Sequence, residues 1–151
     1  MGKKEYDPAM HTAEHILNQT MDRMFACGRS FNAHIEKKKS KCDYRFHRPL
    51  TTEEIAAVEA AVNRVIAGNL PVSEHMVDRA EAERAYFTGK LPADAGERIR
   101  IITVGDYDAC PCIGRHVRST SDITGFRILS TRHENGVLRI RFTLKSAAEG
   151  P

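Results

Sequence analysis

The sequence contains no tryptophan, and aromatic residues make up only 7% of it. No stretch approaches the run of about 18 apolar residues that a membrane-spanning helix requires. Residues 1–8 include two lysines but no apolar segment behind them, so no export signal is indicated. We therefore expect a soluble, cytoplasmic protein with no membrane partner.

Cysteine is also scarce, with four residues in 151. In a chain without an export signal, thiols are kept for metal binding or chemistry rather than for disulfides. A hydrophobic content of 41% allows a chain of this length to bury a core without crosslinks. We predict a single domain over residues 1–151, with its core at about 10–145.

Neither sign of charge dominates, because the formal net charge is only +3. This value permits a polyanionic partner without demanding one. The basic residues nevertheless gather in two groups. One is the lysine cluster at positions 37, 38, 39 and 41, and the other consists of six arginines between positions 115 and 141. The lysine cluster is either a solvated loop or a contact for nucleic acid.

Hydrophobic periodicity and turn residues predict three helices and six strands. Helices are expected at 10–26, 51–67 and 80–87, and strands at 31–35, 42–46, 72–77, 98–104, 126–130 and 137–144. Thr51 and Glu54 form a capping box, and Gly28 and Gly68 are expected to end the first two helices. A loop is expected around Gly89 and Pro92. The pattern predicts an α+β, two-layer domain with a mostly antiparallel sheet and helices packed on one side.

Two pairs of metal-binding residue types lie far apart in the sequence. His11 and His15 are four residues apart on the first predicted helix, so both rings project from one face. Cys112 and His116 have the same spacing across a turn that contains glycine. Three imidazoles and one thiolate suit a tetrahedral zinc ion. Cys110 is a competing thiol, and four protein ligands would make a closed site, whereas catalytic zinc usually keeps one position open.

Several motifs resemble the editing domain of alanyl-tRNA synthetase, and especially its short free-standing relatives called AlaX. They are His11-Thr12-Ala13-Glu14-His15, the segment 50–55, Val62-Asn63, the segment 69–72, Cys112-x-x-x-His116-Val117-x-x-Thr120, and the segment 122–128. The resemblance covers about 10–144, with the motifs in the family's order and spacing.

The resemblance implies a zinc-dependent trans-editing hydrolase that deacylates mischarged alanine tRNA, chiefly tRNA that carries serine, with glycine as the second candidate. It implies the fold of the alanyl and threonyl synthetase editing domain, with zinc held by His11, His15, Cys112 and His116. Two positions depart from the family. Arg115 stands beside the ligands, where it either meets a phosphate or the substrate carbonyl or is simply exposed. Asn32 occupies the position of a serine-sensing threonine, and an amide can also hydrogen-bond a hydroxyl.

Ester hydrolysis needs a water molecule and a group that accepts its proton. Glu14 is the candidate base, although an exposed helix carboxylate is the alternative interpretation, and His34 is a candidate pocket residue. Two other functions stay open. The closed zinc site could be a structural element of a non-catalytic RNA-binding module. The pattern His11-x-x-Glu14-His15 also fits an inverted-zincin metallopeptidase, although that function would leave Cys112 and His116 without a role.

Overall fold

The computed structural model describes residues 7–86 and 96–145. The helices are α1 (Pro8–Phe25), α2 (Thr52–Ala67) and α3 (Arg79–Ala85), with a short 3-10 turn at Thr120–Asp122. The strands are β1 (Asn32–His34), β2 (Ser40–Arg45), β3 (Val72–Asp78), β4 (Arg98–Val104), β5 (Asp108–Pro111), β6 (Phe126–Glu134) and β7 (Val137–Leu144). The expected loop around Gly89 and Pro92 lies outside the described residues, as does Phe87 at the end of the third predicted helix.

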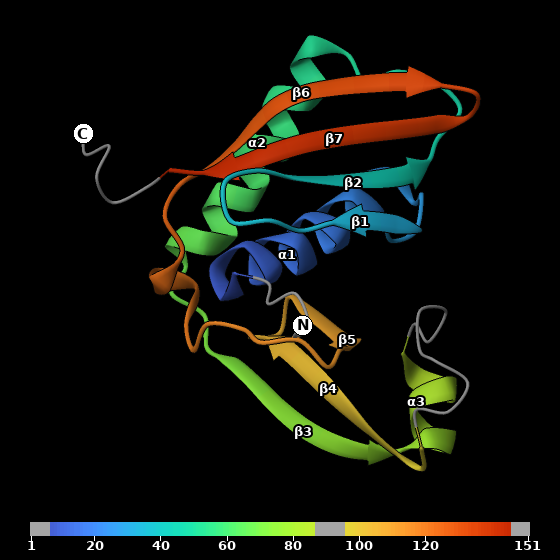
Figure 1. Ribbon diagram of the computed structural model, residues 1–151, viewed down its shortest axis with the longest axis vertical. Coiled ribbons are helices and arrows are strands. Elements are labelled where there is room, and N and C mark those ends of the chain that lie inside the picture. The colour runs from blue at the N-terminus through green and yellow to red at the C-terminus, as the bar shows by residue number, and fades with distance from the viewer. Residues whose placement is uncertain (1–6, 87–95, 146–151) are drawn as a thin grey trace, which may run out of the picture.

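The strands form two antiparallel sheets, one in the order β1-β2-β7-β6 and one in the order β3-β4-β5. Helices α1 and α2 cover one face of the four-stranded sheet, which confirms the predicted α+β class (Figure 1). Within the described residues the two sheets do not join, because α1 lies between the four-stranded sheet and β5 (Figure 1).

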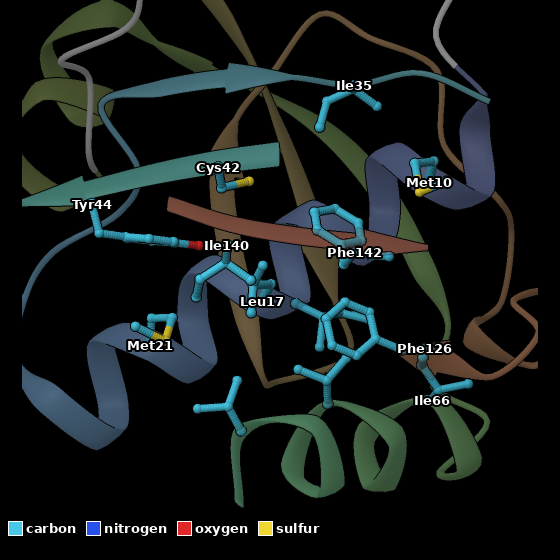
Figure 2. Close-up of a cluster of buried hydrophobic side chains, with 14 of the residues drawn as sticks. Met10, Leu17, Met21, Ile35, Cys42, Tyr44, Ile66, Phe126, Ile140 and Phe142 are labelled. Carbon is cyan, nitrogen blue, oxygen red and sulfur yellow. The ribbon is translucent and has the colours of Figure 1, made fainter. Parts of the chain in front are cut away.

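The main core fills the layer between the four-stranded sheet and the two helices. Strands β2 and β7 alternate inward and outward, and their inward residues Cys42, Tyr44, Ile140 and Phe142 are fully buried. Figure 2 shows these side chains facing Leu17 and the rest of α1. Completely burying an aliphatic or aromatic side chain contributes about 1.5–3 kcal/mol, so this layer is the principal source of stability.

Helix α1 is buried on more than the single face that its periodicity predicts. Asp7 caps its start by accepting a hydrogen bond from the backbone N–H of Met10. Polar residues among Met10–Asn18 are buried together with the apolar ones, because layers cover the helix on both sides. Polar side chains enclosed in this way need partners, and these partners shape the site described below.

Most predicted elements are confirmed within two residues, including the Thr51–Glu54 capping box. The final hairpin is confirmed as well, with Asn135 and Gly136 both at positive φ in its turn. The predicted stop of α2 is confirmed, because Gly68 is the C-cap that follows Ala67. The predicted stop of α1 was wrong, because Ala26 adopts the left-handed conformation ahead of Gly28. Strand β5 was not predicted, since its four residues leave too short a pattern.

Candidate metal centre

The four predicted ligands come together in the structure. His11, His15, Cys112 and His116 each offer one ligand atom, and these atoms all lie within 4.8 Å of one another. The two histidines of α1 extend toward the loop that follows β5, and that loop carries the cysteine and the third histidine. The three rings surround a common point, with centroids 4.4 Å apart for His11 and His116 and 4.5 Å apart for His15 and His116.

The spacing of the ligand atoms fits a tetrahedral ion. Cys112 Sγ lies 3.5 Å from His11 Nε2 and 3.4 Å from His116 Nε2. In a tetrahedral zinc site, Zn–N bonds of about 2.0–2.1 Å and a Zn–S bond of about 2.3 Å place nitrogen and sulfur about 3.6 Å apart. The two sulfur–nitrogen distances therefore match those around a tetrahedral zinc ion.

The thiols differ in which protonation state their surroundings favour. Burial raises the pKa of Cys112, but its contacts with His11, His116 and His15 outweigh burial and lower it to about 3. Burial raises the pKa of Cys110 to about 12, with only a partial offset from Arg29. Only a thiolate is a good metal ligand, so Cys112 rather than Cys110 is suited to that role.

His15 provides the charge that balances this thiolate. Burial lowers its pKa, but the adjacent carboxylate of Asp108 and the thiolate of Cys112 raise it to about 9. Burial and the neighbouring histidines lower the pKa of His116 to about 4, so that ring stays neutral. The cluster thus holds the thiolate of Cys112 beside a protonated His15. A divalent cation would displace the proton of His15 on binding.

Thr12 fixes which nitrogen of His116 carries hydrogen. Its hydroxyl donates to the carbonyl of Pro8 at 3.0 Å and lies 2.9 Å from His116 Nδ1. A hydroxyl has one hydrogen to donate, so Thr12 accepts from His116 Nδ1–H. The lone pair of His116 Nε2 is consequently directed toward Cys112 and is available to a metal.

Asp108 stands in a similar relation to His15. It is buried at the start of β5, and its Oδ2 lies 3.6 Å from the buried Nδ1 of His15. Its Oδ1 accepts hydrogen bonds from Arg29 at 2.7 Å and from Gln19 at 2.8 Å. These contacts hold a carboxylate behind the ring, an arrangement that commonly orients metal-binding histidines.

The loop between Cys112 and His116 packs closely on α1. A Cβ atom at Gly114 would lie 2.2 Å from His11 Cε1 and 2.5 Å from His11 Nδ1, so only glycine fits there. The backbone N–H of Gly114 also donates to Cys112 Sγ at 3.4 Å. Arg100 of β4 donates to the carbonyls of Cys112 and Gly114 at 3.0 and 2.7 Å, which fixes the loop from the other side.

Glu14 borders the cluster and is only 6% exposed, which excludes the interpretation as a solvated helix carboxylate. Its Oε1 lies 3.5 Å from His11 Nε2, the nitrogen that also faces Cys112. Asn18 donates to Glu14 Oε2 at 3.4 Å and accepts hydrogen bonds from Tyr44 and from the backbone of Ser30. A buried polar chain therefore leads from the ligands into the interior.

The remaining predicted site residues are not brought into the ligand cluster. Asn32 pairs with Asp43 and His34 with Lys41 across the hairpin, on the face of the sheet opposite α1. Asn32 donates to Asp43 at 3.2 Å, and His34 contacts Glu36. Arg115 is next to His116, with its side chain exposed.

The sequence interpretation did not identify Asp108, Arg29, Ser30, Asn18 or Arg100 as site residues. One signal was present: Asp108, Cys110 and Cys112 alternate with period two, the pattern that places side chains on one face of a strand. Ser30 could not be predicted, because only the path of the chain after α1 brings it back beside Asn18, where it is completely buried.

The chain resembles known proteins over most of its length. Residues 99–141 match the family model described as the threonyl and alanyl tRNA synthetase second additional domain. The alanine–tRNA ligase of Aeropyrum pernix is 39% identical over 140 residues, which is 87% of this chain and 15% of that protein. Those of Natronomonas pharaonis and Archaeoglobus fulgidus are 34% and 33% identical over 91% of this chain and 15% and 16% of their own lengths.

The family match identifies residues 99–141 as part of an additional domain of the kind found in threonyl and alanyl tRNA synthetases. The chain spans about one sixth of the curated relatives that it matches. Within this class the chain is an alanyl-tRNA synthetase-related domain. Among the described residues, no helix is long and apolar enough to cross a membrane.

Proposed function

We propose that this protein is a zinc-dependent aminoacyl-tRNA deacylase that removes serine from mischarged alanine tRNA in the cytoplasm, with glycine as the second candidate substrate. The main support is the convergence of four ligand atoms of the right type and spacing with a buried carboxylate, Glu14, beside them. The relationship to alanine–tRNA ligases supplies the substrate class.

His11, His15, Cys112 and His116 would hold the ion, which when bound supplies a Lewis acid for the ester carbonyl or for a water molecule. Glu14, whose Oε1 lies 3.5 Å from His11 Nε2, would accept a proton from the attacking water. Arg115, exposed beside His116, would contact the phosphate nearest the ester. Ile113 is 80% exposed between Cys112 and Gly114 and gives the rim of the site an apolar contact.

Discrimination between serine and alanine requires a polar group that hydrogen-bonds the extra hydroxyl and is left unpaired by alanine. Asn32 and His34 were predicted for substrate binding, but their side chains lie on the opposite face of the sheet. Ser30 is a second candidate on the same segment, because it is buried beside Asn18 in the polar chain that leads to the ligands. Separate Ser30→Ala and Asn32→Ala variants would show which residue controls the preference for serine.

The deciding experiment measures release of amino acid from serine-, glycine- and alanine-charged alanine tRNA, with and without a chelator. We expect release of serine, little release of alanine, and loss of activity on chelation. Cys112→Ala should lose zinc and activity, whereas the matched variant Cys110→Ala, two residues earlier, should keep both. Glu14→Gln should keep zinc and lose hydrolysis.

A non-catalytic RNA-binding module is the second candidate, and the observation that favours it is the closed set of four protein ligands. Full zinc binding with no release from any charged tRNA would support this function and refute ours. An inverted zincin, by contrast, would use a carboxylate as its third ligand. The positions of Cys112 and His116 beside His11 argue against that arrangement.

A further inference from the structure

The four-stranded sheet has a second face, opposite α1, on which basic side chains gather. Inward residues of β2, β6 and β7 belong to the core, so the residues that alternate with them project outward. The outward set includes six cations, which together we call the basic face: Lys41 and Arg45 of β2, Arg139 and Arg141 of β7, and Arg127 and Arg132 of β6.

Few acidic groups balance this charge. The outward positions of the three strands carry two carboxylates, Asp43 and Glu134. Asp43 accepts hydrogen bonds from Arg139 at 2.8 and 3.0 Å, and Glu134 accepts from Arg132 at 3.0 Å. The face still carries four net positive charges, more than the formal +3 of the whole chain. The rest of the molecule is therefore slightly acidic, and the basic character of the protein resides on this face.

The arrangement includes a direct repulsion. Lys41 and Arg141 are partners in the register of β2 and β7, so their side chains stand beside each other on the same face. Like charges at directly opposed positions destabilise a sheet. Within residues 7–86 and 96–145, neither side chain has an ion pair with a carboxylate. An anion bound between the two side chains would relieve this repulsion.

The lysine cluster lies at one end of the basic face. Thr143, outward on β7, donates a hydrogen bond to the carbonyl of Lys38 and so holds the β1–β2 loop against that end. Lys37, Lys38 and Lys39 are exposed on this loop. The two basic groups that are far apart in the sequence thus form one surface.

An aromatic platform lies at the other end of β2. The guanidinium of Arg45 lies 3.9 Å from the ring centroid of Phe31, which is 41% exposed. Arginine and aromatic planes next to cationic grooves are the elements on which unpaired bases stack. This combination fits RNA better than a uniformly charged lipid surface.

We propose that the basic face, together with the lysine loop, binds the sugar-phosphate backbone of tRNA. The identification of this RNA as tRNA rests on the function proposed above. The face lies on the far side of the sheet from α1 and the metal centre, so it contributes affinity for the body of the RNA and does not take part in hydrolysis.

The test uses uncharged tRNA, so it does not depend on whether the protein hydrolyses esters. Binding is measured by fluorescence anisotropy between about 50 and 200 mM salt for the native protein, for K41Q/R141Q and for the control R64Q/R84Q. The control removes two exposed arginines from α2 and α3, away from the face. Each lost phosphate contact reduces the slope of log K against log salt by about 0.7–0.9.

For K41Q/R141Q we expect the slope to fall by about 1.4–1.8 and the affinity at 0.1 M salt to fall on the order of tenfold or more. Zinc content should stay unchanged, and the control should bind like the native protein. Equal losses in the two variants, no loss in K41Q/R141Q, or binding to vesicles of anionic lipid in preference to tRNA would each overturn the proposal. If K41Q/R141Q lost tRNA affinity and the native protein had no deacylase activity, the proposal that the basic face binds tRNA would stand and only the enzymatic function would be refuted.

Discussion

Replacing Gly114 with alanine should remove one ligand from the metal centre through a steric clash. The new Cβ would lie 2.2 Å from His11 Cε1, whereas carbon atoms pack at about 3.5–4.0 Å. The ring or the loop must therefore move by about 1.3 Å or more. Metal–ligand distances tolerate only about 0.2 Å, so a ligand in that position no longer reaches the ion.

We expect the zinc affinity of Gly114→Ala to fall by at least about 100-fold, since orienting contacts alone already contribute about 10–100-fold. The strain of one added methyl group costs about 1–3 kcal/mol of unfolding free energy, so the fold should persist. Affinity can be measured by competition with a chromophoric chelator, and folding by thermal denaturation.

Gly125→Ala is the matched control. It makes the same chemical change in another loop, where the nearest atom to the new Cβ would be Lys145 Cβ at an ordinary 3.9 Å. This variant should bind zinc like the native protein. If Gly114→Ala also kept native affinity with an unshifted melting temperature, His11 could not be held where the structure places it, and its assignment as a ligand would be wrong.

Three further outcomes are expected. Asp108→Asn should weaken zinc binding about 10–100-fold in the chelator assay, whereas Asp43→Asn, which disrupts a similar buried aspartate–arginine pair away from the metal, should not. The pKa of Glu54 is lowered to about 2 by Arg48 and the backbone of Thr51. The ionised carboxylate therefore stabilises the folded state fully above the unfolded pKa near 4.5, and this stabilisation is lost as the pH falls toward 2. In urea titrations, the difference in unfolding free energy between the native protein and Glu54→Gln should narrow between these two pH values. Chelation should reduce hydrogen-exchange protection in β3–β5 while leaving α1, α2 and the four-stranded sheet protected.

The sequence predicted the elements of this fold better than it predicted their ends. The Thr51–Glu54 box and the Asn135–Gly136 turn are local interactions, so a few neighbouring residues determine them. The stop of α1 is less local, because Ala26 accepts a left-handed conformation that isolated propensities disfavour. The division into two sheets depends on α1 lying between them, and that is a property of the whole fold.

The candidate site, like the fold, could be predicted from the sequence only in part. The ligands were predictable because residue type and the four-residue spacing carry their chemistry. Their supports were not, since the contacts of Asp108 with Arg29 and of Arg100 with the ligand loop join segments far apart in sequence. Asn32 was predicted from the position of the serine-sensing threonine in the resembling family, but strand alternation directs its side chain outward with Asp43.

The candidate metal centre lies between α1 and the loop that follows β5, and this position bears on its role. The main core joins α1, α2 and the four-stranded sheet, whereas Val77, Ala82, Ile99 and Ile101 form a separate cluster on the β3–β5 side. Both units bury apolar residues independently of any ion, so an ion at their junction is not required to form either core. The polar contacts of Thr12 and Asp108 already orient two of the rings. Such orienting contacts are common to metal-binding histidines of catalytic and structural sites alike. What favours the deacylase over the structural module is that neither core needs the ion in order to form.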